Sequence, residues 1–159
     1  MKISSEYFKK IMSHFISGVT IISTKDHEGK FFGLTASSFA SLSLDPPLIL
    51  FCLSSSSKSL LPIETSKTFA VSILSEDQAD ISDHFAKHKI DKFTDIDYDL
   101  GSFSSCPLIT GANCWIECSL YANYDGGDHR IIVGKVENLI TGAEKGPLAY
   151  YNRDYRKIL

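Results

Sequence analysis

The segment most informative about the fold reads CWIECSLYANY at residues 114–124, DGGD at 125–128 and RIIVGKVENLI at 130–140. In the first part, small or aliphatic side chains alternate with larger or more polar ones at a period of two, which predicts a half-buried strand. The glycine-rich turn then joins this strand to a second one, so the sequence predicts a long antiparallel hairpin. One face of the first strand is expected to carry Cys114, Ile116, Cys118, Leu120 and Ala122, and the other Trp115, Glu117, Ser119, Tyr121 and Asn123.

Segments on the N-terminal side of this hairpin predict more strands and a few helices. Apolar residues between Tyr7 and Phe15 recur at helical spacing after Ser4 and Ser5, which predicts an amphipathic helix ending near Gly18. The remaining patterns predict strands at residues 19–24, 31–36, 48–53 and 68–74, helices near 60–65 and 76–87, and mostly loop over 88–113.

This order of elements favours a mainly β fold. The strands do not alternate regularly with helices, so a doubly wound parallel sheet is disfavoured and an antiparallel barrel or sandwich is favoured. We therefore expect an antiparallel β-barrel with an N-terminal helix and a few peripheral helices. A chain of 159 residues is long enough for one such domain, spanning residues 1–159.

Composition excludes several classes of function. The net charge is −3 without a basic run, so nucleic acid is not expected as the main partner. No secretory signal or membrane span is recognisable, and the four cysteines are expected to be reduced, which predicts a cytoplasmic protein. Cys114 and Cys118 would lie about 13 Å apart on a strand, so no metal site is expected there.

Three polar segments are candidates for ligand binding. There is no G-x-G-x-x-G or Walker sequence, so any phosphate must be bound by residues outside these glycine-rich motifs. The run Ser54–Ser59 with Lys58 offers hydroxyls, backbone N–H groups and a cation, although it also fits a flexible polar loop. Residues 35–41 combine small and hydroxyl side chains after a strand, and they also fit a structural turn. His129 beside the 125–128 turn suits proton transfer, or is simply solvated.

The ordered segments together resemble one known family. Gly18–Thr24, Gly33–Leu48, Phe69–Leu74, Gly127–His129, Ile132–Val136 and Pro147–Tyr151 resemble landmarks of the flavin reductase-like family of FMN-binding split barrels, in the same order. The resemblance covers about residues 8–157. It implies an antiparallel split barrel, commonly a homodimer, that binds FMN, with FAD as a further candidate, and oxidises NADH or NADPH.

The resemblance also implies roles for individual residues. His129 and Tyr155 are expected to face the nicotinamide, with His129 assisting the reaction, and Phe85 to cover the flavin. At position 37, where this chain has serine, many relatives carry asparagine. The expected flavin contacts are Thr35, Ala36, Ser37, Ser38 and Ser41 at the ring and ribityl chain, Phe51 and Cys52 beside them, and Ser54, Ser57, Lys58 and Ser59 at the phosphate.

The sequence is compatible with three functions. The first is a reductase that supplies reduced flavin to a partner monooxygenase. The second is a flavin-binding electron carrier that is reduced by another protein; NADH oxidation with added flavin distinguishes it from the first. The third is a split barrel that binds a different planar ligand, which a yellow colour of the purified protein would exclude.

Overall fold

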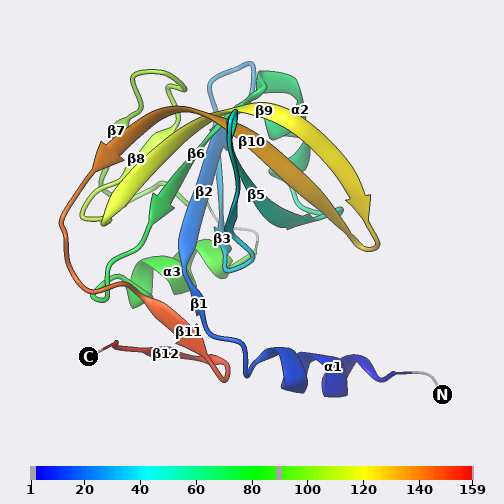
Figure 1. Cartoon of the computed structure of the whole chain (residues 1–159). Helices are drawn as coiled ribbons and strands as arrows, with labels where there is room; N and C mark the ends of the chain where they lie inside the picture. The colour runs from blue at the N-terminus through cyan, green and yellow to red at the C-terminus, as the bar shows by residue number, and fades with distance from the viewer. Residues whose placement is uncertain (1–2, 89–90, 159) are drawn as a thin grey trace.

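The computed structural model describes residues 3–88 and 91–158. Its centre is a seven-stranded antiparallel sheet in the order β3-β2-β6-β9-β10-β5-β4, which curls strongly (Figure 1). The predicted mainly β, antiparallel class is confirmed. The strands of this sheet are β2 (Thr20–Lys25), β3 (Phe31–Ala36), β4 (Ala40–Leu44), β5 (Pro47–Ser54), β6 (Thr68–Ile73), β9 (Cys114–Gly126) and β10 (His129–Thr141).

Smaller elements surround this sheet. Helices α2 (Leu60–Ser66) and α3 (Ala79–Ala86) lie near opposite ends of the strands, whereas α1 (Ser5–Met12) extends away from the sheet (Figure 1). A three-stranded sheet at the same end as α3 contains the C-terminal hairpin. The remaining strands are β1 (Ser17–Gly18), β7 (Tyr98–Leu100), β8 (Pro107–Ile109), β11 (Ala149–Tyr151) and β12 (Asp154–Arg156).

The predicted long hairpin is confirmed as β9 and β10, each of 13 residues. Its pairing register shifts between Val133 and Gly134 and again between Val136 and Asn138. Gly134 is required at the first shift because a Cβ there would collide with the ring of Phe69. These irregularities increase the local bend of the ladder, which lets the sheet curl.

Two hydrophobic clusters pack on the two faces of the central strands. Ile22 faces the interior of the curled sheet with Phe51 and Phe69, whereas its neighbour Ile21 packs on the other side in a cluster with Phe85. Strand β2 is therefore covered on both faces, which explains why its sequence shows no simple alternation between apolar and polar residues.

Two expectations about local structure were wrong. The N-terminal helix ends at Met12 instead of near Gly18. Of the two serines that precede it in the prediction, Ser4 caps it by accepting a hydrogen bond from the Tyr7 N–H. The 88–113 region contains the hairpin β7–β8 within the predicted loop. This hairpin is fixed by distant partners, because Ser23 Oγ donates to the Pro107 carbonyl and the Ile109 N–H donates to Ser72 Oγ.

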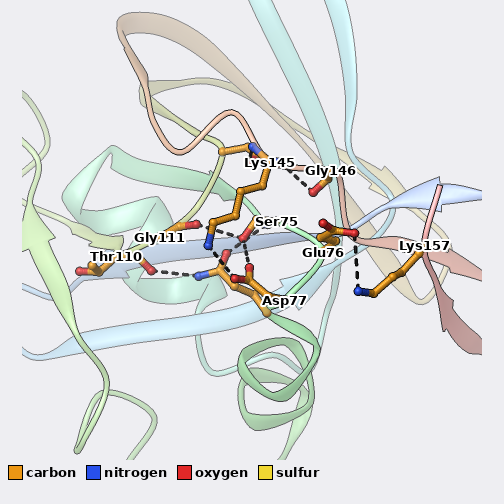
Figure 2. A network of polar contacts seen from close by, with 10 residues as sticks. Ser75, Glu76, Asp77, Thr110, Gly111, Lys145, Gly146 and Lys157 are labelled. Carbon is orange, nitrogen blue, oxygen red and sulfur yellow. Dashed lines mark hydrogen bonds and ion pairs between the residues drawn. The ribbon is translucent and has the colours of Figure 1, made fainter. Parts of the chain in front are cut away.

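A polar network fastens the connection between β10 and the C-terminal hairpin (Figure 2). Lys145 Nζ lies 2.6 Å from a carboxylate oxygen of Asp77, and Ser75 Oγ donates to the other oxygen of Asp77 at 2.6 Å. The Glu76 N–H donates to the Gly146 carbonyl at 2.8 Å. The chain entering β11 is thereby tied to the segment that precedes α3, so α3 and the C-terminal hairpin are held at the same end of the sheet.

Candidate functional site

A cavity of about 430 Å³ opens between strand β3, helix α3 and the C-terminal hairpin. These segments are far apart in the sequence, and they meet because the network around Asp77 holds the hairpin beside α3. The lining is mainly polar and includes both acidic and basic groups. It consists of Val19, Thr35, Ser37, Ser82, Asp83, Ala86, Tyr150, Arg153, Asp154 and Tyr155.

Hydrogen bonds across the cavity wall connect the three segments. Thr35 Oγ1 donates to the Ser82 carbonyl at 2.6 Å, and the Tyr155 hydroxyl lies 2.8 Å from Ser82 Oγ and 2.7 Å from a carboxylate oxygen of Asp83. Burial raises the pKa of Tyr155 to about 12, and the nearby Asp83 carboxylate acts in the same direction. The phenol of Tyr155 therefore stays protonated near neutral pH and can act as a hydrogen-bond donor.

The corner between β3 and β4 presents a second group of hydroxyls. Ser38 Oγ accepts a hydrogen bond from the Cys52 N–H at 2.9 Å and lies 3.2 Å from the Cys52 carbonyl, which it can reach as a donor. This double contact fixes the corner against β5. The side chains of Ser37, Ser38 and Ser41 are exposed, so a flat polar ligand can approach them.

The serine loop, residues Ser54–Ser59, lies beside the turn that carries His129. His129 pairs with Ser54 across the β5–β10 ladder, and the Ser55 N–H donates to the Asp128 carbonyl at 3.0 Å. His129 Nδ1 lies 2.7 Å from the Asp128 carboxylate, and this hydrogen bond lowers the pKa of Asp128. Lys58 is exposed, so the loop presents a cation and hydroxyls next to an imidazole.

Two expected flavin contacts belong to the hydrophobic core. The rings of Phe51 and Phe85 are fully buried, the first against Phe69 and the second against Phe93. Phe85 also fills the space above Gly33, where a Cβ would come within 2.6 Å of its ring. In this structure neither ring has a surface to offer a ligand. Ala36 and Ser59 are also buried.

The structure divides the remaining predicted residues between two places. Tyr155 lies in the cavity with Thr35 and Ser37, whereas His129 lies at the serine loop and is not part of the cavity lining. The expectation that His129 and Tyr155 face one ring is therefore not reproduced by contacts within the described part of a single chain. The roles of these residues in flavin and nicotinamide binding stay predictions.

Several cavity residues had no signal in the sequence. Ser82 and Asp83 lie in a segment that was predicted only as a helix, and Arg153 lies in a C-terminal segment where only Tyr155 was expected to contact a ligand. They become candidates because tertiary structure brings them to Thr35. Among the described residues, no group of three or more His, Cys, Asp or Glu side chains is placed to bind a metal ion, and no helix is long and apolar enough to cross a membrane.

Comparison with known proteins places these features in context. The sequence model of the flavin reductase like domain matches residues 12–159. The reductase subunit of a flavin-dependent monooxygenase from Mycobacterium tuberculosis is 38% identical over 99% of this chain and 84% of its own. The reductase component of 4-hydroxyphenylacetate 3-monooxygenase from Thermus thermophilus is 39% identical over 97% of both chains.

A solved structure agrees with these matches. The NADH:FAD oxidoreductase of Streptomyces globisporus, determined in complex with NAD and FAD fragments, superposes with a TM-score of 0.92 at 31% identity, covering 100% of this chain and 98% of that one. The agreement extends over the whole fold, and the resemblance seen in the sequence is confirmed. This chain belongs to the family of the flavin reductase like domain.

Proposed function

We propose that this chain is an NAD(P)H-dependent flavin reductase that supplies reduced flavin to a partner monooxygenase. The observation that carries the proposal is family membership across residues 12–159, together with relatives that are reductase components of monooxygenases. These relatives favour a reductase over an electron carrier reduced by another protein. They also disfavour a split barrel that binds a different planar ligand.

The described residues fit a flavin. The exposed hydroxyls of Ser37, Ser38 and Ser41 can bond the polar edge of the ring and the ribityl chain, and the exposed Lys58 can pair with a phosphate. When bound, the flavin accepts a hydride from the nicotinamide and stores the electron pair. The chain itself orients the two ligands, with Thr35 on the flavin side and the protonated phenol of Tyr155 on the nicotinamide side of the cavity.

The protein is further proposed to act as a homodimer. The apolar side of α1 is only partly covered by the described residues of its own chain, since Tyr7, Phe8 and Ile11 are between 51% and 62% exposed. On the edge strand β4, Leu44 is 96% exposed. A second copy could cover such surfaces. Sedimentation should then give twice the chain mass of 17.6 kDa, and a monomer at micromolar concentration would contradict this proposal.

Steady-state assays test the main proposal. NADH and NADPH oxidation should be measured with riboflavin, FMN and FAD in turn, because the preference for one flavin or one nicotinamide is not decided by the fold. We expect oxidation that depends on added flavin, with FMN as a substrate. If no combination supports oxidation while the protein still binds flavin, the electron carrier becomes the better description.

A cytoplasmic location and a single domain over residues 1–159 stay predictions. The cytoplasmic location agrees with the four free cysteines.

A further inference from the structure

Ser82 and Asp83, at the middle of α3, contact both sides of the cavity. The Ser82 carbonyl accepts the hydrogen bond of Thr35 on β3, while the side chains of Ser82 and Asp83 meet the hydroxyl of Tyr155 on β12. Ser82 is 1% exposed, whereas Asp83 is exposed, so the anchor combines one buried contact residue with one at the rim of the cavity. Two consecutive residues thus connect the expected flavin segment to the expected nicotinamide side.

The direction of these hydrogen bonds follows from the chemistry of the groups. A phenol has one proton, and an ionised carboxylate can only accept. The Tyr155 O–H therefore donates to Asp83, and the Ser82 O–H donates to the Tyr155 oxygen. With both its donor and one acceptor position used, the Tyr155 hydroxyl has a single favoured orientation. Its ring is held from the side by Tyr150, at a centroid distance of 5.4 Å.

The C-terminal hairpin is also fastened at its entry and at its turn, where the Leu148 N–H donates to the Leu74 carbonyl and the Asn152 N–H to the Ser13 carbonyl, but its outer strand has few ladder partners. Among the described residues, strand β12 pairs only with β11, and β11 pairs with the two-residue strand β1, so the hairpin lies outside the seven-stranded sheet. Short strands with few ladder partners open easily. Contacts between Tyr155 and α3 hold the free strand of the hairpin against the cavity.

We propose that Ser82 and Asp83 are positioning residues that hold Tyr155 in place and so preform the nicotinamide side of the cavity next to the flavin segment at Thr35. This inference rests on the proposed function. If the cavity wall is already ordered, the protein loses less conformational entropy when the nicotinamide binds. The anchor therefore affects binding of the nicotinamide more than binding of the flavin or the rate of hydride transfer.

The test compares Asp83→Ala, Asp83→Asn, Ser82→Ala and Tyr155→Phe in the full chain. With saturating FMN, we expect Asp83→Ala to raise the KM for NADH about three- to tenfold, as loss of a charge-assisted hydrogen bond would, with kcat and the Kd of FMN changed less than about twofold. Asp83→Asn keeps an acceptor oxygen and should restore most of the loss. Asp80→Asn is the matched control, because it removes an exposed charge from the first turn of the same helix.

A double-mutant cycle separates positioning from an independent effect of Asp83. If Asp83 acts through Tyr155, the double variant Asp83→Ala/Tyr155→Phe should have the same KM as Tyr155→Phe alone. Carbon-13 NMR of tyrosine labelled at the ring carbon that bears the hydroxyl gives a readout independent of activity. The Tyr155 pKa, about 12 in the intact chain, should fall in Asp83→Ala because a neighbouring negative charge is removed.

The outcomes distinguish this inference from the proposed function. If the unmodified chain reduces flavin normally and Tyr155→Phe raises the KM, but Asp83→Ala and Ser82→Ala do not, the positioning role is refuted and the proposed function stands. Additive effects in the double variant refute it as well. If the unmodified chain oxidises no nicotinamide with any flavin, the proposed function itself fails, and the inference fails with it.

Discussion

Two polar regions of this molecule use their hydrogen-bonding groups in opposite ways. In the Glu117 cluster, one oxygen of the buried Glu117 carboxylate accepts bonds from the N–H groups of Phe103 and Ser104 and from the Ser104 hydroxyl, at 2.7 to 3.0 Å. The other oxygen accepts from Asn138 at 2.7 Å. Burial alone would raise the pKa of Glu117, but these donors hold it below its usual value.

The serine loop leaves most of its groups available. Ser55, Ser56 and Lys58 are exposed, and the internal contacts of the loop are modest, such as the 3.0 Å approach of the Ser54 and Ser56 hydroxyls. A cluster whose donors and acceptors are all used within the chain stabilises the fold. A loop with exposed hydroxyls and an exposed cation can offer them to a ligand. Substitutions should therefore affect stability in the first region and binding in the second.

The largest expected effect is on stability, from Glu117→Ala. It leaves several buried donors without acceptors, so we expect the free energy of unfolding to fall by about 3–5 kcal/mol. Urea denaturation followed by circular dichroism measures this. Glu137→Ala is the control, because Glu137 bonds Ser119 and Lys135 at the exposed surface. If the two variants lose equal stability, burial of the carboxylate does not explain the difference between the regions.

Lys58→Ala should affect binding instead of stability. If Lys58 pairs with the phosphate, FMN binding weakens by about 1–2 kcal/mol while riboflavin binding is unchanged. Riboflavin lacks the phosphate and is therefore the internal control. Isothermal titration with both flavins makes the comparison. Equal losses for both would place the phosphate elsewhere and leave the serine loop as a polar surface turn.

His129→Ala tests the turn beside the serine loop. We expect the efficiency with NADH to fall about tenfold, which corresponds to about 1.4 kcal/mol of transition-state stabilisation. The affinity for FMN should stay within about threefold, a difference under about 1 kcal/mol. Stopped-flow reduction of bound flavin measures the two effects separately. Unchanged reduction kinetics would mean that His129 is only a solvated turn residue.

The smallest effect concerns an exposed carboxylate. Hydrogen bonds from Lys145 and Ser75 lower the pKa of Asp77 to about 2. A lowered pKa means that the unfolded chain binds the proton more tightly than the folded chain. The contribution of Asp77 to stability is therefore present above the ordinary aspartate pKa of 3.8 and is lost as the pH falls toward about 2. The difference in melting temperature between the unmodified chain and Asp77→Asn should shrink over that interval. A difference that does not change with pH would contradict this assignment.

Local sequence patterns were sufficient to predict most strands of the central sheet. The alternation over 114–124 with the glycine turn predicted β9 and β10, and the apolar run 48–53 predicted β5, because a strand has a regular side-chain period and a tight turn restricts the residues it accepts. The strands β7 and β8 were missed because three residues are too few to show a period. The resemblance supplied the family and the candidate flavin segments.

Other features were decided only by tertiary structure. Glu117 was expected on the less apolar face of its strand, yet it is fully buried because a loop 13 to 14 residues away surrounds its carboxylate with donors. Phe85 was expected at the flavin, yet it fills the space above Gly33. The contact of Tyr155 with Ser82 and Asp83 joins residues more than 70 positions apart. No local period or turn preference encodes such contacts, because they depend on how the whole sheet curls and where the C-terminal hairpin is fastened.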